Sequence, residues 1–341
     1  EAEYVADDEQ TYYTRGCKYG LLGTAFALSG LLCWAGISQV IGNSVTTSFQ
    51  NAFGIPQVAT ATILVAMSAV IVLRKNATVK VLDMVVPVMA GAYFLVTLFV
   101  IIKNITLLPS VIGNIFSQAF GIRQFAGGGL GVIVMNGVKR GLFSNEAGSG
   151  SAPCAAAAAE VSHPVKQGLV QMLSVFIDTL LLCTATAMMC MSSGIDPAKE
   201  LQGAPWVQAS LQESLGSFGP IFITVAMVFF AFTTLLGNCF YCDNLLIYIH
   251  KKQPGKAFMK GFRLVSALAI FLGAGMEMSL LWDLSDVLMG VMALINIPVI
   301  LILSGIAFKV IQDYEAQLKQ GINPVFKSAD IGLSQKTDFW R

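Results

Sequence analysis

The 341-residue chain is 55% hydrophobic and only 12% charged, and its formal net charge is +1. Soluble domains carry about 25% charged residues, so this composition excludes an ordinary soluble protein and indicates a membrane protein. A net charge so close to zero gives no electrostatic reason to expect a nucleic-acid partner.

Eight apolar segments approach or exceed the length of about 20 residues that a helix needs to cross a bilayer. They cover residues 20–41, 58–73, 81–102, 127–154, 169–191, 220–249, 262–276 and 284–310. Between the third and the fourth, residues 108–120 show an amphipathic pattern that is typical of a helix at the membrane interface. The sequence therefore predicts an all-α membrane protein, a single-domain bundle of about eight transmembrane spans.

Lysine and arginine residues in the loops predict the orientation of the chain, because cytoplasmic loops are enriched in them. When the loops are assigned alternately to the two sides, one side receives most of these cations: Arg15, Lys18, Arg74, Lys75, Lys80, Lys166, Lys251, Lys252, Lys256, Lys260, Arg263, Lys309, Lys319 and Lys327. A polar segment at 1–19 and a polar tail at 312–341 are therefore predicted to be cytoplasmic. We expect a multi-pass protein of the cytoplasmic membrane, surrounded by lipid bilayer.

The fourth apolar segment contains a stretch that is too polar for a lipid-facing helix. Residues 139–153 read KRGLFSNEAGSGSAP. Glycine and proline interrupt helical hydrogen bonds, and backbone groups released at membrane depth need protein, water or a ligand as partners. A broken span offers free N–H groups at one half-helix end and free C=O groups at the other, which suit a carboxylate and a cation respectively. We interpret this stretch as half of a binding site rather than as a polar loop.

Glu146 and Asp178 are acidic residues within predicted spans, where an ionisable side chain is costly and indicates a function. Glu146 could neutralise Lys139 or Arg140, or it could hold the broken segment open and help to bind a cation or an ammonium group. Asp178 could likewise pair with one of these two cations, or it could relay protons. The structural interpretation is favoured for Asp178, and the functional one for Glu146.

Thr233 and Thr234 are adjacent hydroxyl residues in the middle of the sixth apolar segment. Paired hydroxyl oxygens are suitable ligands for Na⁺, but threonine in a membrane helix more often bonds to a carbonyl of its own turn. The sequence contains no catalytic GxSxG, phosphate-binding or HExxH motif, and its two histidines do not support a metal centre. An enzyme is therefore not expected.

The polar stretch also resembles the signature of a known transporter family. GVKRGLFSNEAG at 137–148, followed by GSAP at 150–153, is similar to the signature of the alanine or glycine:cation symporters. Further similar segments are HPVKQGLVQM at 163–172, FIDT at 176–179, CTATA at 183–187, FAFTT at 230–234, GVMAL at 290–294 with Asn296, and NPVF at 323–326. The resemblance covers nearly all of the chain from residue 20 onward.

This resemblance implies an inverted-repeat transporter of the leucine-transporter type, in which five spans are followed by five inverted spans. On that plan the chain supplies spans three to ten, and the polar stretch is the broken sixth span beside the substrate. The implied substrate-binding residues are Phe143, Ser144, Asn145, Glu146, Gly148 and Asn238. The hydroxyls of Thr233 and Thr234 would belong to a sodium site in the eighth span.

The sequence departs from the family pattern in three respects. The first two core spans are absent, so we expect an N-terminally incomplete domain; the start at Glu1, without a signal-peptide pattern, fits a piece of a longer or processed protein. Ile41 stands near a position where relatives have glutamine. Asn238 stands where they have tryptophan, and Cys242-Asp243 where they have a Gly-Glu pair.

The function expected from these observations is secondary active symport of a small neutral amino acid, alanine or glycine, with Na⁺ or H⁺. No cofactor is expected apart from the coupling ion. The alternative is a truncated remnant or subunit that lacks the first half of the substrate site and does not transport. A channel is a third interpretation.

Overall fold

The computed structural model describes residues 20–73, 75–120, 129–157, 159–195, 203–250, 252 and 254–332. Over these ranges the chain forms helices and no strand, which confirms the predicted all-α class. The helices are α1 (Gly20–Phe53), α2 (Gln57–Leu73), α3 (Lys75–Lys103), η1 (Ile105–Leu107), α4 (Leu108–Phe120), α6 (Gly129–Ser144), α7 (Ser151–Ala156), α8 (Pro164–Val175), η2 (Phe176–Leu182), α9 (Cys183–Ser192), α10 (Ala204–Leu215), α11 (Phe218–His250), α12 (Lys256–Gly273) and α13 (Met278–Lys319).

Five helical stretches in the described part of the chain are long and apolar enough to cross a membrane: Leu21–Phe53, Met84–Lys103, Pro164–Ser192, Phe218–His250 and Met278–Lys319. The other three predicted spans are helical but do not reach this standard. Helix α2 has only 17 residues, α6 is interrupted, and α12 carries Lys256, Lys260 and Arg263. A protein with several membrane spans is thus confirmed, whereas the count of eight and the inverted repeat remain predictions.

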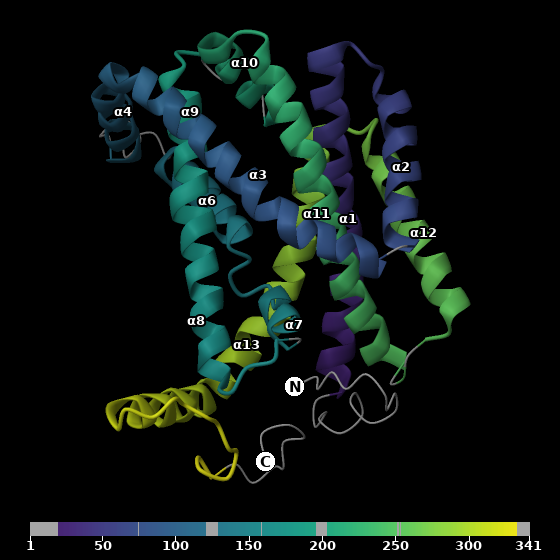
Figure 1. Ribbon diagram of the computed structural model, residues 1–341, viewed down its shortest axis with the longest axis vertical. Coiled ribbons are helices and arrows are strands. Elements are labelled where there is room, and N and C mark those ends of the chain that lie inside the picture. Colours follow the sequence, from purple (N-terminus) through teal and green to yellow (C-terminus); the bar gives the residue numbers. More distant parts are fainter. Residues whose placement is uncertain are drawn as a thin grey trace.

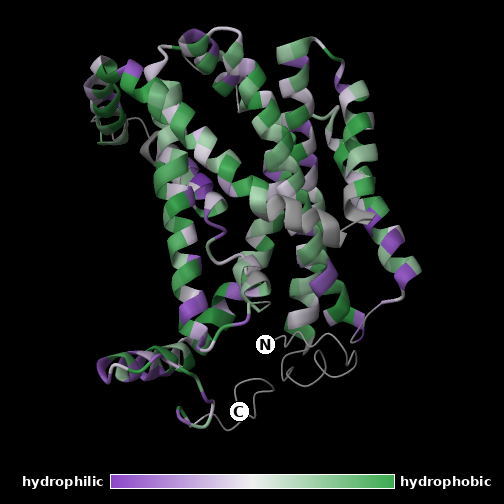
Figure 2. Cartoon of the chain, in the orientation of Figure 1, coloured by the Kyte–Doolittle hydropathy of each residue, from purple (hydrophilic) through white to green (hydrophobic). Residues whose placement is uncertain are grey.

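Helix α1 is the central element of the structure, and it packs against α11, α13, α12, α2 and α10. Figure 1 shows α1 among α2, α11 and α12, with α6, α8 and α9 in a second group. Helix α3 crosses obliquely between the groups and contacts both α9 and α11. In Figure 2 hydrophobic residues cover the middle of the helices, and hydrophilic residues gather at their lower ends, notably at the end of α13 and the start of α12.

Polar side chains along α1 are satisfied within the protein, as an apolar surrounding requires. Ser38 donates a hydrogen bond to the carbonyl of Trp34 at 2.8 Å, and Thr46 donates to the carbonyl of Gly42 at 3.0 Å. The Asn43 amide donates to the carbonyls of Gly273 and Met276 at 2.9 and 2.8 Å. These two carbonyls lie at the C-terminal end of α12, where helices leave carbonyls unpaired, so Asn43 joins α12 to the central helix.

The backbones of α1 and α12 approach each other closely at Gly273. A Cβ atom on Gly273 would lie 2.4 Å from the carbonyl oxygen of Gln39 and 2.7 Å from its Cα. Small residues permit this kind of helix contact in membranes. The contact fixes α12 against α1 at the level where Asn43 binds the end of α12.

We therefore expect Gly273→Ala to destabilise the protein by about 1–3 kcal/mol, because backbone atoms cannot move aside as a flexible side chain can. The matched control is Gly261→Ala on the same helix, where an added Cβ meets nothing within 4 Å. Thermal unfolding in detergent should give a lower Tm for Gly273→Ala alone. Equal Tm values for the two variants would contradict this packing.

Candidate functional site

The predicted interruption of the fourth apolar segment is present. Helix α6 ends at Ser144, and the six-residue helix α7 begins at Ser151. Between them Glu146, Gly148 and Gly150 have φ angles of 51°, 77° and 89°. Among the described residues Glu146 is the one non-glycine with a positive φ, a conformation that carries a steric cost and is often found at functional sites.

Helices α1 and α13 both contact the break. The Asn296 amide of α13 donates a hydrogen bond of 3.0 Å to the carbonyl of Gly148. A Cβ atom on Gly150 would lie 2.7 Å from the ring of Phe26 in α1 and 3.0 Å from the Asn296 amide carbon. The break is therefore an ordered turn that requires glycine at 150 for close contact as well as for its φ angle.

Oxygen atoms gather around the break. The Ser151 hydroxyl donates to the Glu146 carboxylate, and Ser149 and Ser151 lie 3.0 Å apart through their hydroxyls. The Ser144 hydroxyl donates to Asp178 at 2.9 Å. Asp178 belongs to η2, a seven-residue π-helix, and such segments are frequent at functional sites. Two carboxylates and three serine hydroxyls thus lie at the point where the helix is interrupted.

The cations before the break have a partner that the sequence analysis missed. Lys139 Nζ and Arg140 Nη2 lie 3.2 and 2.7 Å from Asp286 Oδ2 of α13. Neutralisation of these cations was the favoured interpretation for Asp178 and the alternative for Glu146. Among the described ion pairs their partner is Asp286 of α13, and Asp178 accepts from Ser144 instead. Asp286 is an acidic residue inside an apolar segment, and the rule that flagged Asp178 would also have found it.

An aromatic pair stands beside this ion cluster. The Arg140 guanidinium lies 4.5 Å from the ring centroid of Trp282, and the rings of Trp282 and Phe143 are 5.0 Å apart at 71°. Trp282 therefore contacts both the cation and the aromatic residue that precede the break. The predicted residues Phe143, Ser144, Asn145, Glu146 and Gly148 therefore lie in or beside one turn, bounded by α1, α13 and η2.

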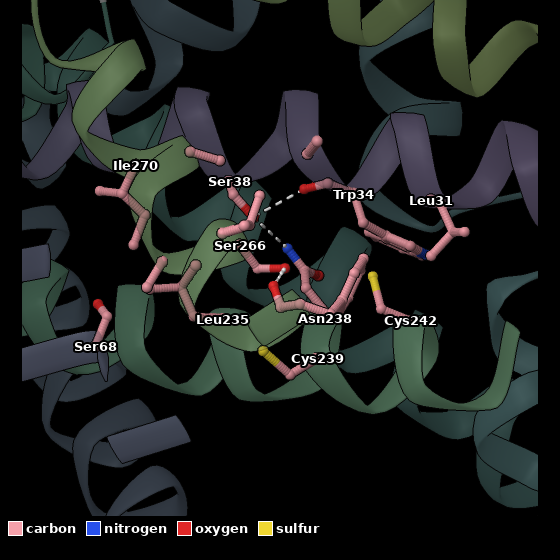
Figure 3. Close-up of a pocket in the computed structure, with 15 residues that line it drawn as sticks. Leu31, Trp34, Ser38, Ser68, Leu235, Asn238, Cys239, Cys242, Ser266 and Ile270 are labelled. Atoms are coloured by element: carbon pink, nitrogen blue, oxygen red, sulfur yellow. Dashed lines mark hydrogen bonds between the residues drawn. The ribbon is translucent and has the colours of Figure 1, made fainter. Parts of the chain in front are cut away.

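The remaining predicted site residues lie on α11. Asn238 is buried, and its amide lies 3.4 Å from the Ser38 hydroxyl of α1. It lines a cavity of about 120 Å³, mostly apolar, between α1, α2, α11 and α12 (Figure 3). No residue of the break lines this cavity, so the structure does not place Asn238 in one pocket with Glu146.

Both predicted sodium ligands bond to their own helix. The hydroxyls of Thr233 and Thr234 donate to the carbonyl of Phe230 at 2.8 and 2.9 Å. This is the bonding that threonine usually adopts in a membrane helix. Thr233 is half-buried and Thr234 is exposed. Their role in binding Na⁺ stays a prediction, and no described hydrogen bond joins them to the break.

Comparison with known proteins shows the family to which the chain belongs. A family model described as the sodium:alanine symporter family matches residues 9–328. The chain is 39% identical over 331 residues to the amino-acid carrier protein AlsT of Bacillus subtilis, covering 96% of this chain and 70% of that protein. The chain belongs to the sodium:alanine symporter family.

Other relatives in this family carry similar names. The chain is 38% identical over 314 residues to a sodium/proton-dependent alanine carrier protein of Bacillus sp. PS3, with 87% of this chain and 70% of that protein covered. It is 35% identical over 308 residues to the sodium/alanine symporter AgcS of Methanococcus maripaludis, with coverage of 87% and 67%. The family match runs across nearly the whole chain and lends no support to the expectation of an N-terminally incomplete domain.

Within this family member, the Arg140–Asp286 pair should contribute measurably to stability. We expect a double-mutant cycle with Arg140→Gln and Asp286→Asn to give a coupling of about 0.5–1 kcal/mol, because the 45% exposure of Arg140 screens the interaction. The control is Asp283→Asn, one turn away and exposed, which should show no coupling to Arg140. Chemical unfolding in detergent measures both cycles. Equal coupling in the two cycles would rule out a specific ion pair.

Proposed function

We propose that this protein carries a small neutral amino acid, alanine or glycine, across the cytoplasmic membrane together with Na⁺. The observation that carries the proposal is the ordered break between α6 and α7, with carboxylates, hydroxyls and an aromatic pair around it. Family membership supports the same conclusion, since the relatives are named as amino-acid carriers and sodium/alanine symporters. Their names do not favour the alternative of a non-transporting remnant.

The charges around the break suit the two ends of a zwitterion. The C-terminal end of α6 carries partial negative charge, and the carboxylates of Glu146 and Asp178 add to it, so an ammonium group is stabilised there. Lys139 and Arg140, which precede the break on α6, share the single carboxylate of Asp286, and this leaves one positive charge in excess. That excess favours a carboxylate. Phe143 and Trp282 supply an apolar surface for the side chain of the substrate.

The residues proposed to bind the substrate are Phe143, Ser144, Asn145, Glu146 and Gly148. Ser144 and Glu146 supply oxygen atoms, and Asn145 and Gly148 shape the turn, because Asn145 accepts from the Ala147 N–H at 2.9 Å. Asn238 is assigned to this group by resemblance, and it would act through α1, whose Ser38 it contacts. The transport step would be a rocking of one group of helices against the other, which exposes the break to each side in turn.

The proposed sodium ligands are the hydroxyl oxygens of Thr233 and Thr234. Each hydroxyl donates its hydrogen to the carbonyl of Phe230, and this orients the oxygen lone pairs away from the helix. Oxygens oriented in this way are available to a hard cation. H⁺ is the alternative coupling ion, and one relative is named as dependent on both sodium and protons.

The proposal is tested by uptake of labelled alanine into vesicles that contain the purified protein. We expect uptake against a concentration gradient when a sodium gradient is imposed, and little uptake with equal sodium on both sides. A proton gradient serves as the comparison for the coupling ion. Absence of gradient-driven uptake for alanine, glycine and other small amino acids would refute the proposed function.

Thr233→Val and Thr234→Val should each raise the sodium concentration for half-maximal uptake by about tenfold, which corresponds to about 1.4 kcal/mol of lost binding energy. The matched control is Thr62→Val in α2, because Thr62 is exposed and bonds to the carbonyl of Val58 at 2.8 Å in the same manner. An unchanged sodium dependence in the two α11 variants, with normal expression, would show that these threonines are structural.

A further inference from the structure

Two segments far apart in the sequence meet at the lower end of the molecule. One is the start of α8 with the residues just before it, 162–166, and the other is residues 322–328, which we call the tail clasp. Figure 1 shows the last part of α13 turned beneath the lower end of α8, with the chain doubling back along it. Pro324, Phe326 and Ser328 are buried, whereas the residues between them are exposed. The tail clasp is thus an extended segment that turns one face to the protein.

Hydrogen bonds tie the tail clasp to both helices that it touches. On the α8 side the Phe326 N–H donates to the carbonyl of Ser162 at 2.9 Å, and Lys166 Nζ donates to Asn323 Oδ1 at 2.7 Å. On the α13 side Gln317 exchanges two bonds with Val325, of 3.0 and 2.9 Å. The tail clasp therefore bridges α8 and α13.

His163 is the buried centre of this contact. Its side chain is fully buried, and the rings of Tyr314 and Phe326 lie 4.9 and 5.3 Å from its imidazole. Nδ1 accepts the Val165 N–H at 3.2 Å and thereby caps the N-terminus of α8. Nε2 lies 3.2 Å from Asp313 Oδ2, which identifies Nε2 as the protonated nitrogen.

This geometry requires a neutral imidazole. A proton on Nδ1 would replace the acceptor of the Val165 N–H with a second donor, so the cap would be lost. The ionisable groups facing the ring are Asp313 and Tyr314 from α13 and Lys166 from α8. Burial lowers the pKa of His163, the charge of Lys166 acts in the same direction, and Asp313 opposes them without reversing the shift.

We propose that the tail clasp is a pH-sensitive lock, which holds α8 to α13 while His163 is neutral and releases them when His163 is protonated. Its position links it to the break, because α13 carries Asn296, which holds Gly148, and α8 continues into η2, whose Asp178 accepts from Ser144. Release of the tail clasp separates α8 from α13, the two helices connected to the break, and this slows transport. The transport part of this inference rests on the proposed function, and the structural part does not.

The direction of the pH dependence follows from the lowered pKa. An opened tail clasp exposes His163 and restores its ordinary pKa of about 6.5, so the open state takes up protons more readily. The locked state has its full stability above that value. As the pH falls below it, the ratio of open to locked protein rises by up to about tenfold per pH unit, until the pKa of the locked state is reached.

Thiol labelling tests the lock without reference to transport. In reconstituted protein, Ser328→Cys places a thiol on the buried face of the tail clasp, and Lys327→Cys places one on its exposed face as the control. A charged maleimide that does not cross membranes is applied at about pH 7.5 and about pH 5.5. Labelling of the parent protein is subtracted. We expect the rate at 328 relative to 327 to rise several-fold at the lower pH.

The variant that removes the titration is His163→Gln, whose amide can still donate to Asp313. With it, the relative labelling rate should no longer depend on pH. A second variant, Phe326→Ala, should open the tail clasp already at neutral pH, whereas Val325→Ala at an exposed position should not. The lock would be overturned if the rate at 328 relative to 327 did not depend on pH in protein that keeps His163. It would also be overturned if this rate rose equally in His163→Gln.

Sodium-driven alanine uptake in the same vesicles tests the consequence for transport. Acidification on the side that carries the tail clasp should slow uptake in the parent and leave His163→Gln unaffected. An equal loss in both would refute the regulatory role. If no variant transports at any pH, the proposed function has failed, and the labelling result still decides whether the lock exists.

Discussion

The structure depends on one constraint, that backbone polar groups at membrane depth must find partners inside the protein. Over residues 145–150 the helical bonds of α6 and α7 are interrupted, and the turn meets this constraint with bonds of its own and from α13. Ala147 donates to the Asn145 side chain, and the carbonyl of Gly148 accepts from Asn296. The conformation of the break therefore depends on its contacts with α1 and α13, and these contacts fix its position relative to the two helices.

The charged side chains around the break divide into two sets that do not neutralise each other. Lys139 and Arg140 turn to Asp286 of α13, whereas Glu146 and Asp178 bind serine hydroxyls. Because the carboxylates beside the turn are not paired with the cations before it, the region keeps separate positive and negative poles. A zwitterion is the ligand class that such poles recognise, which connects the geometry of one turn to amino-acid transport.

The sequence predicted the elements that depend on local pattern. The break was visible because glycine, proline and charged residues interrupt an apolar run, and a helix was predicted at 108–120, where α4 lies. Contacts between distant residues could not be predicted from pattern alone. Asp286 reaches Arg140 only because α13 passes within reach of the long side chains of α6, and Asn238 contacts Ser38 because α1 packs against α11. The contact of His163 with Phe326 likewise depends on the bend that returns the tail to α8.

The central claim, that the substrate binds at the break, is tested most directly at Cys183. This native thiol is exposed and lies 3.3 Å from the Ser144 hydroxyl. The rate of its modification by a small uncharged thiol reagent can be followed with and without ligands, with Cys183→Ser defining the signal. The account predicts that alanine and sodium together slow the reaction several-fold and that neither does so alone. An unchanged rate in protein that transports alanine would contradict it.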